Sequence, residues 1–115
     1  MRAVVGVVVL FNALMYFSPS VGAVGANDTR PAELAFSNKK LNSTYQLLLK
    51  RLSTENQTNL RAAQRAWIKF RDLDCKWAFA AEINDCLIDR TESRIEQLNE
   101  TLFFDPEGNY ETLNR

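Results

Sequence analysis

The 115-residue chain contains no histidine. Histidine is the commonest general base in enzymes and a frequent zinc ligand, so its absence removes the usual catalytic triads and most zinc sites. The two cysteines, Cys75 and Cys86, have a spacing that fits neither a metal site nor a Cys-x-x-Cys redox pair. Beyond residue 26 the one glycine is Gly108, which excludes a glycine-rich phosphate loop. No enzymatic activity, metal or cofactor is therefore expected.

One pair of carboxylates remains to be considered for catalysis. Asp72 and Asp74 are two residues apart, and on a helix such side chains point to different sides. Ion pairs with Arg71 or Lys76 explain them better than the paired carboxylates of a glycosidase do. The sequence favours a binding protein.

No charge of either sign is in excess, since 14 basic residues face 14 acidic ones. The chain opens with Arg2 and an apolar run from Ala3 to Phe17, followed by small-residue patterns that end at Ala23 and Ala26. This order predicts a secretory signal peptide over residues 1–26, because the apolar run is short for a membrane span. An uncleaved membrane anchor is the alternative.

Cleavage would leave 13 basic and 14 acidic residues and no membrane anchor. A formal charge near −1 argues against non-specific binding to nucleic acid or to membrane surfaces. An exported domain this small commonly needs a disulfide, so Cys75 and Cys86 are expected to pair in a periplasmic or secreted protein.

The exported chain shows helical periodicity throughout. A polar, disordered lead is expected over residues 27–36, and a first helix from Ser37 or Asn38. Its inward positions are Leu41, Tyr45, Leu48, Leu49 and Leu52. A capping box formed by Thr54 and Gln57 indicates a second helix after a very short link, although a kinked continuous helix would give nearly the same pattern.

The second helix has an apolar and a basic side. Leu60, Ala63, Trp67 and Phe70 share one predicted apolar face, and Arg61, Arg65 and Lys69 follow one another at steps of four. On one straight helix Cys75 and Cys86 would lie roughly 16 Å apart. A disulfide requires Cα atoms within about 7 Å, so the chain must turn back, around residues 80–84.

The third helix is expected from Asn84 or Asp85, with an inward and an acidic face. The inward positions are Leu87, Thr91, Ile95, Leu98 and Leu102, and the acidic ones are Asp85, Asp89, Glu92, Glu96 and Glu100. A turn-forming run over 105–108 ends the helix and opens a polar tail, 105–115. The predicted fold is all-α: a small antiparallel three-helix bundle, or a helical hairpin plus a third helix, over residues 37–104 and stapled by one disulfide.

The charged stripes and the tryptophans each have two interpretations. The stripes are either solvated faces that at most pair loosely with each other, or the acidic one docks onto a basic protein partner. Trp67 is expected in the core, whereas Trp77 near the corner is either core or an exposed binding anchor.

The sequence resembles the LprI-like lysozyme-inhibitor domain family, a group of small exported bacterial proteins. The matching residues are Leu41-Asn42, Tyr45-Gln46, Leu48, Leu60-Arg61, Ala63 to Ile68, Phe70-Arg71-Asp72, Cys75, Cys86-Leu87, Thr91, Arg94 and Leu98. Relatives carry further cysteines upstream and a longer, glycine-containing segment between the cysteines that match Cys75 and Cys86; this chain has neither. The resemblance implies export to the bacterial envelope, a disulfide-stapled helical fold and, for some members, inhibition of lysozyme.

Within the motif a group of residues is interpreted as fold-defining rather than catalytic. These are Gln64, Trp67, Phe70, Arg71, Asp72, Thr91 and Arg94. An Arg71–Asp72 contact and a Thr91 hydroxyl bonded to helix backbone would fix how the last two helices pack.

The leading hypothesis is an inhibitor that occludes the cleft of a lysozyme-type muramidase. The candidate partner-binding residues are Lys76, Trp77, Glu82, Asp85, Asp89, Glu92 and Glu96. The alternative is a non-inhibitory envelope interaction or stability protein.

Overall fold

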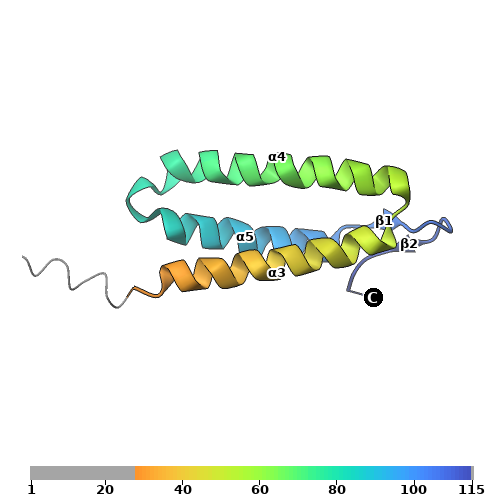
Figure 1. Cartoon of the computed structure of the whole chain (residues 1–115), viewed down its shortest axis with the longest axis horizontal. Helices are drawn as coiled ribbons and strands as arrows, with labels where there is room; N and C mark the ends of the chain where they lie inside the picture. The colour runs from red at the N-terminus through yellow and green to blue at the C-terminus, as the bar shows by residue number, and fades with distance from the viewer. Residues whose placement is uncertain (1–27, 115) are drawn as a thin grey trace, which may run out of the picture.

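A computed structural model describes residues 28–114, so the predicted signal peptide lies outside the described residues. The elements are α3 (Arg30–Arg51), α4 (Thr54–Ala78), the 3₁₀-helix η2 (Ala80–Glu82), α5 (Ile83–Glu100), β1 (Phe103–Phe104) and β2 (Tyr110–Glu111). Figure 1 shows α4 antiparallel to both α3 and α5, which makes α3 and α5 parallel. The predicted bundle of three packed helices with one disulfide is confirmed.

The first helix begins earlier than expected. α3 starts at Arg30, seven residues before Ser37, so the prediction of a disordered lead is wrong from Arg30 onward. Pro31 lies in the first turn, where a helix tolerates proline because the missing N–H would have no partner there. The Arg30 N–H donates to Asp28 Oδ1 at 3.0 Å. A proline at this place starts the helix instead of marking a loop.

The link between α3 and α4 is short, as predicted, and the two helices are separate. The cap of α4 is Ser53 and not Thr54, since the Ser53 hydroxyl accepts the backbone N–H three residues later at 3.3 Å. The side-chain amide of Gln57 donates to the carbonyl oxygens of Leu49 (3.0 Å) and Leu52 (3.2 Å). Gln57 thus helps to cap the end of α3, where the Leu49 carbonyl also accepts the Leu52 backbone N–H at 3.2 Å.

The core lies mainly between α3 and α5, which pack along their whole lengths, whereas α3 and α4 touch sparsely. Its buried members are Leu41, Leu48, Leu52, Ile95 and Leu98. The predicted inward positions of the first helix are therefore confirmed as buried or, for Tyr45, half-buried. The prediction that Leu102 lies inward on the third helix is wrong. Leu102 is 56% exposed, because α5 ends at Glu100 and the chain continues in an extended conformation.

The predicted apolar face of α4 packs inward only in part. Leu60 and Trp67 are half-buried and pack against the core cluster, as expected for Trp67, whereas Phe70 is 59% exposed. The buried residues of α4 are Gln64 and Cys75. Since successive residues are about 100° apart on a helix, directing Cys75 toward α5 turns Phe70 outward.

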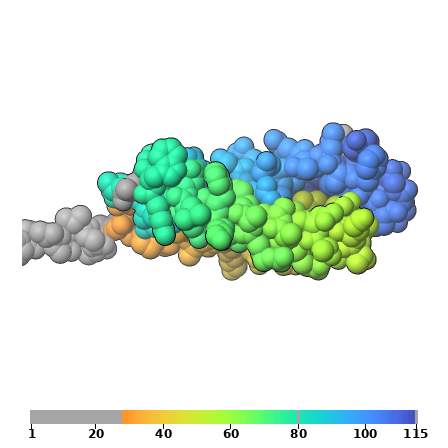
Figure 2. Space-filling view, turned by 90° about the horizontal axis from the view of Figure 1, so that it is seen from above, coloured from red at the N-terminus to blue at the C-terminus, as the bar shows by residue number. Residues whose placement is uncertain are grey.

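The chain turns back where the disulfide requires it. Cys75 and Cys86 are bonded, with their Cα atoms 5.6 Å apart, and both are buried. Between α4 and α5 the chain passes through η2, close to the predicted turn at residues 80–84. We call Lys76 to Ile83 the corner; Figure 1 and Figure 2 show it at one end of the bundle, opposite the blue C-terminal segment.

The C-terminal segment forms a hairpin, where a strand-free polar tail was predicted. Phe103 pairs with Glu111 and Phe104 with Tyr110 in antiparallel register. Gly108 has φ +87°, a value that favours glycine, and allows the tight turn. Phe103 and Leu113 pack against the core cluster, so this segment extends the bundle.

Candidate protein-binding surfaces

A buried polar contact joins α4 to α5. Thr91 is fully buried; its hydroxyl donates to the Leu87 carbonyl at 2.6 Å and accepts from Arg71 Nη1 at 3.0 Å. The same nitrogen of Arg71 donates to Asn38 Oδ1 at 2.9 Å, and Arg71 Nε donates to Asp72 Oδ1 at 3.0 Å. One arginine thus contacts all three helices.

Trp67 makes cation–π contacts with two guanidinium groups. Arg71 and Arg94 lie over its ring, with 5.5 Å and 5.6 Å from guanidinium carbon to ring centroid. Arg94 Nε donates to Oε1 of the buried Gln64 at 3.1 Å, and burial lowers the pKa of the Arg94 guanidinium from its ordinary value. Of the seven motif residues, the structure brings six together here; Phe70 points outward.

The corner exposes large apolar side chains on a rigid frame. Trp77 is 77% exposed and Phe79 49% exposed, and Lys76 beside them is also exposed. The Trp77 indole N–H donates to Asp74 Oδ1 at 2.9 Å, which holds the ring against its own helix. Sequence reasoning included Lys76 and Trp77 among its candidates but missed Phe79, which follows the end of α4.

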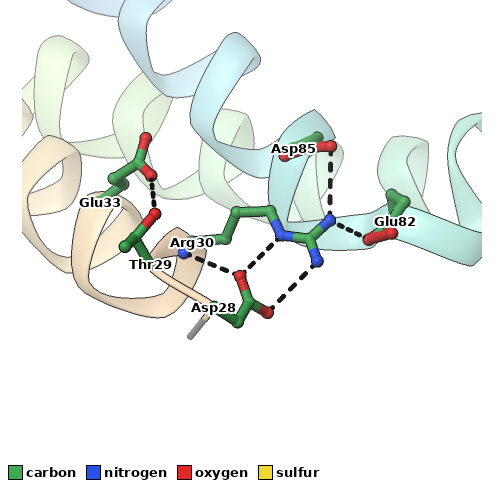
Figure 3. Close-up of polar contacts among 6 residues, drawn as sticks. All are labelled: Asp28, Thr29, Arg30, Glu33, Glu82 and Asp85. Carbon is green, nitrogen blue, oxygen red and sulfur yellow. Dashed lines mark hydrogen bonds and ion pairs between the residues drawn. The ribbon is translucent and has the colours of Figure 1, made fainter. Parts of the chain in front are cut away.

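Arg30 ties the start of α3 to the corner and to α5. It pairs with Asp28 at 2.8 Å, with Glu82, and with Asp85 at 3.6 Å (Figure 3). The hydrogen bond from the Arg30 side chain lowers the pKa of the Asp28 carboxyl and raises that of Arg30. Two of the predicted partner-binding carboxylates, Glu82 and Asp85, are therefore engaged within the chain.

Three further predicted carboxylates form an exposed row on α5, and we call Asp89, Glu92 and Glu96 the acidic stripe. Asp89 pairs with Arg90, and Glu92 accepts a long hydrogen bond of 3.4 Å from Ser37 of α3. Ser37 is buried, but Asp89, Glu92 and Glu96 are all exposed, so the carboxylates remain accessible to solvent.

A groove of about 370 Å³ runs between α3 and α4 on the other side of α3. We call it the basic groove; its lining residues are Asn38, Leu41, Asn42, Tyr45, Arg61, Gln64, Arg65, Ile68 and Arg71. In the described part of the chain no ion pair joins Arg61, Arg65 or Lys69 to the acidic stripe. Loose pairing between the two predicted stripes is thus not realised.

Apart from its basic row, α4 also has an exposed apolar face. Phe70, Leu73 and Trp77 follow one another at steps of three and four and are 59%, 54% and 77% exposed. We call these three residues the apolar stripe. It was missed because an apolar helix face was equated with the inward face.

The described residues offer neither a metal site nor a membrane-spanning helix. Within residues 28–114 no group of three or more acidic or cysteine side chains could hold a metal ion. No helix in this range is long and apolar enough to cross a membrane.

A profile of the family described as Lysozyme inhibitor LprI matches residues 20–98. The chain belongs to the LprI family. No curated protein and no solved structure matches it.

LprI is a family of lysozyme inhibitors and not of enzymes, and its role is extracytoplasmic. The matched range covers α3, α4 and nearly all of α5, and stops before the hairpin. The corner, the acidic stripe and the basic groove all lie within it.

Proposed function

We propose that this LprI-family chain is an exported protein that binds a lysozyme-type muramidase and inhibits it by occupying the substrate cleft. The supporting observation is the corner, where exposed Trp77 and Phe79 stand at the end of the bundle. The Cys75–Cys86 bond fixes the two helices that meet there. A rigid projection loses little conformational entropy when it enters a cleft, which favours tight binding.

The chemistry of the corner is complementary to such a cleft. Muramidases of this type hold two carboxylic acids at the scissile bond. Exposed Lys76, next to Trp77, supplies a cation for these carboxylates. The aromatic rings of Trp77 and Phe79 provide flat apolar surfaces for positions that normally bind sugar rings.

The acidic stripe supports the encounter with a basic enzyme. Asp89, Glu92 and Glu96 are exposed along α5, whereas Glu82 and Asp85 are held by Arg30. Carboxylates at the rim of an interface chiefly raise the association rate and fix orientation. Their contribution is expected to fall as salt concentration rises.

The test is an inhibition titration of the oxidised, exported chain against several classes of lysozyme. Lys76→Glu and Trp77→Ala should each weaken inhibition by roughly tenfold or more, which corresponds to about 1.4 kcal/mol. Lys50→Glu, which changes an exposed lysine near the other end of the bundle, is the matched control and should leave inhibition unchanged.

The two parts of the proposal fail separately. Inhibition that survives both corner variants would reject the corner as the inserted element. Inhibition that survives reversal of Asp89, Glu92 and Glu96 to lysine would reject the stripe.

A second candidate is an envelope interaction protein without inhibitory activity, and the apolar stripe favours it. Exposed apolar rows of this kind often mark protein-binding surfaces. If no lysozyme class is inhibited, and Phe70→Glu with Leu73→Glu abolishes capture of a partner from envelope extract, this candidate replaces the first.

A further inference from the structure

The basic groove and the acidic stripe carry opposite charges, and the chain does not pair them with each other. Arg61 and Arg65 line the groove, and Lys69 continues their row along α4. None of the three forms an ion pair with another residue between 28 and 114. The basic row is therefore available to a surface of opposite charge, and within residues 28–114 the acidic stripe has one ion pair, between Asp89 and Arg90.

The two rows have matching lengths. At a rise of 1.5 Å per residue, Arg61 to Lys69 spans roughly 12 Å, and Asp89 to Glu96 roughly 10 Å. Three cations and three carboxylates are thus spaced for one straight contact between two helices.

An exposed aromatic ring lies beside the acidic stripe. Phe36 of α3 is 68% exposed, and it lines the same surface hollow as Glu33 and Glu92. The basic groove has apolar walls where such a ring would be buried, formed in part by Tyr45 and Ile68. A phenyl ring flanked by carboxylates fits an apolar groove rimmed by arginines.

We infer that the basic groove receives a second copy of this chain. Phe36 of one copy enters the groove of the next, and the acidic stripe of the first pairs with Arg61, Arg65 and Lys69 of the second. The contact joins two different surfaces, so it is heterologous, and further copies can add to either side. It does not rest on the proposed function, although both use the acidic stripe, because its test involves no enzyme.

The association is expected to be weak and sensitive to salt. Exposed ion pairs contribute little individually, and two molecules lose translational and rotational freedom when they associate. Charges act over about 30 Å at roughly 0.01 M salt but only about 3 Å near 1 M. The oxidised, exported chain should therefore show a mass in sedimentation equilibrium that rises with concentration at low salt and stays monomeric at high salt.

Charge reversal makes the test specific. Arg61→Glu with Arg65→Glu should weaken self-association by roughly tenfold or more, and so should Glu92→Lys with Glu96→Lys. Because each double variant has two like-charged surfaces, the two should be monomeric alone and associate when mixed. Phe36→Ala should also weaken association, by roughly tenfold.

The matched control is Lys50→Glu, an exposed lysine in the last turn of α3, compared with the single variant Arg65→Glu, which changes the net charge equally. It should associate like the unmodified chain. The inference is overturned if the unmodified chain is monomeric at every concentration and salt level. It is equally overturned if the arginine variant associates normally, or if the two reversed variants remain monomeric when mixed.

Discussion

The buried contact between Thr91 and Arg71 gives a sharp stability prediction. Thr91→Val keeps the side-chain shape, so no cavity forms, but it removes the acceptor that Arg71 Nη1 contacts at 3.0 Å. A hydrogen bond to a charged group contributes about 1.5–3 kcal/mol. Because Arg71 keeps Asn38 and Asp72 as acceptors, we expect a loss near the lower end, about 2 kcal/mol.

In a domain of this size the expected loss lowers the Tm by roughly 10 °C. Urea unfolding followed by circular dichroism measures the free energy directly. A double-mutant cycle with Arg71→Met isolates the pair, since the bond from Thr91 to the Leu87 carbonyl is present in both backgrounds and cancels. The coupling should be about 1.5–2 kcal/mol.

Thr58 provides a matched control. Its hydroxyl donates to the carbonyl of Thr54 one turn earlier, as Thr91 does to Leu87, but at the surface and without an arginine. Thr58→Val should change stability by less than about 0.5 kcal/mol. A coupling near zero, or equal losses at the two threonines, would show that the Arg71 contact does not stabilise the packing of α4 on α5.

Two further predictions concern the disulfide at one end of the bundle and the Asp105 carboxylate at the other. Reduction of Cys75–Cys86, or replacement of both by alanine, should lower the unfolding free energy by about 3 kcal/mol in the chain-entropy model, measured by urea unfolding with and without reductant; an unchanged midpoint would contradict it. At the other end, the backbone N–H of Asn109 and other hairpin donors hold the pKa of the Asp105 carboxyl below its ordinary value. This stabilisation is present above the unfolded pKa of about 3.9 and is lost as pH falls through the lower folded value. Asp105→Asn should remove this dependence, and NMR signals of Asn109 should report it; a carboxyl that titrates at its ordinary pKa would rule it out.

The sequence predicted the parts of the fold that depend on apolar periodicity and covalent geometry. Leu41, Leu48 and Leu98 were placed inward, and the spacing of the cysteines required the turn that η2 makes. The residues at the ends of helices and strands did not predict those ends reliably. Pro31 falls within the lead that the sequence predicts to be disordered, although it occupies the first turn of α3. The hairpin depends on Asp105 accepting backbone N–H bonds across its turn.

The rotation of α4 was the harder problem. Phe70 and Leu73 point outward, while the inward face carries Gln64 and Arg71 beside Leu60 and Trp67. A hydrophobicity pattern predicts the apolar pair inward and the polar pair outward, which is the reverse of what the structure has. The polar side chains lie inward because they bond to particular partners on other helices. Those partners, Thr91 among them, cannot be identified from spacing within a single helix.

The core and the disulfide join different pairs of helices, and this affects the order in which the helices are expected to fold. The core joins α3 to α5, and the contact between Ser37 and Glu92 spans 55 residues, whereas the cysteines are separated by 11. Closing the longer loop costs roughly 1.4 kcal/mol more in chain entropy. The helix pair α4–α5 is therefore expected to form first and to close its disulfide. Although α3 comes earlier in the chain, it is expected to pack last, onto the disulfide-bonded pair.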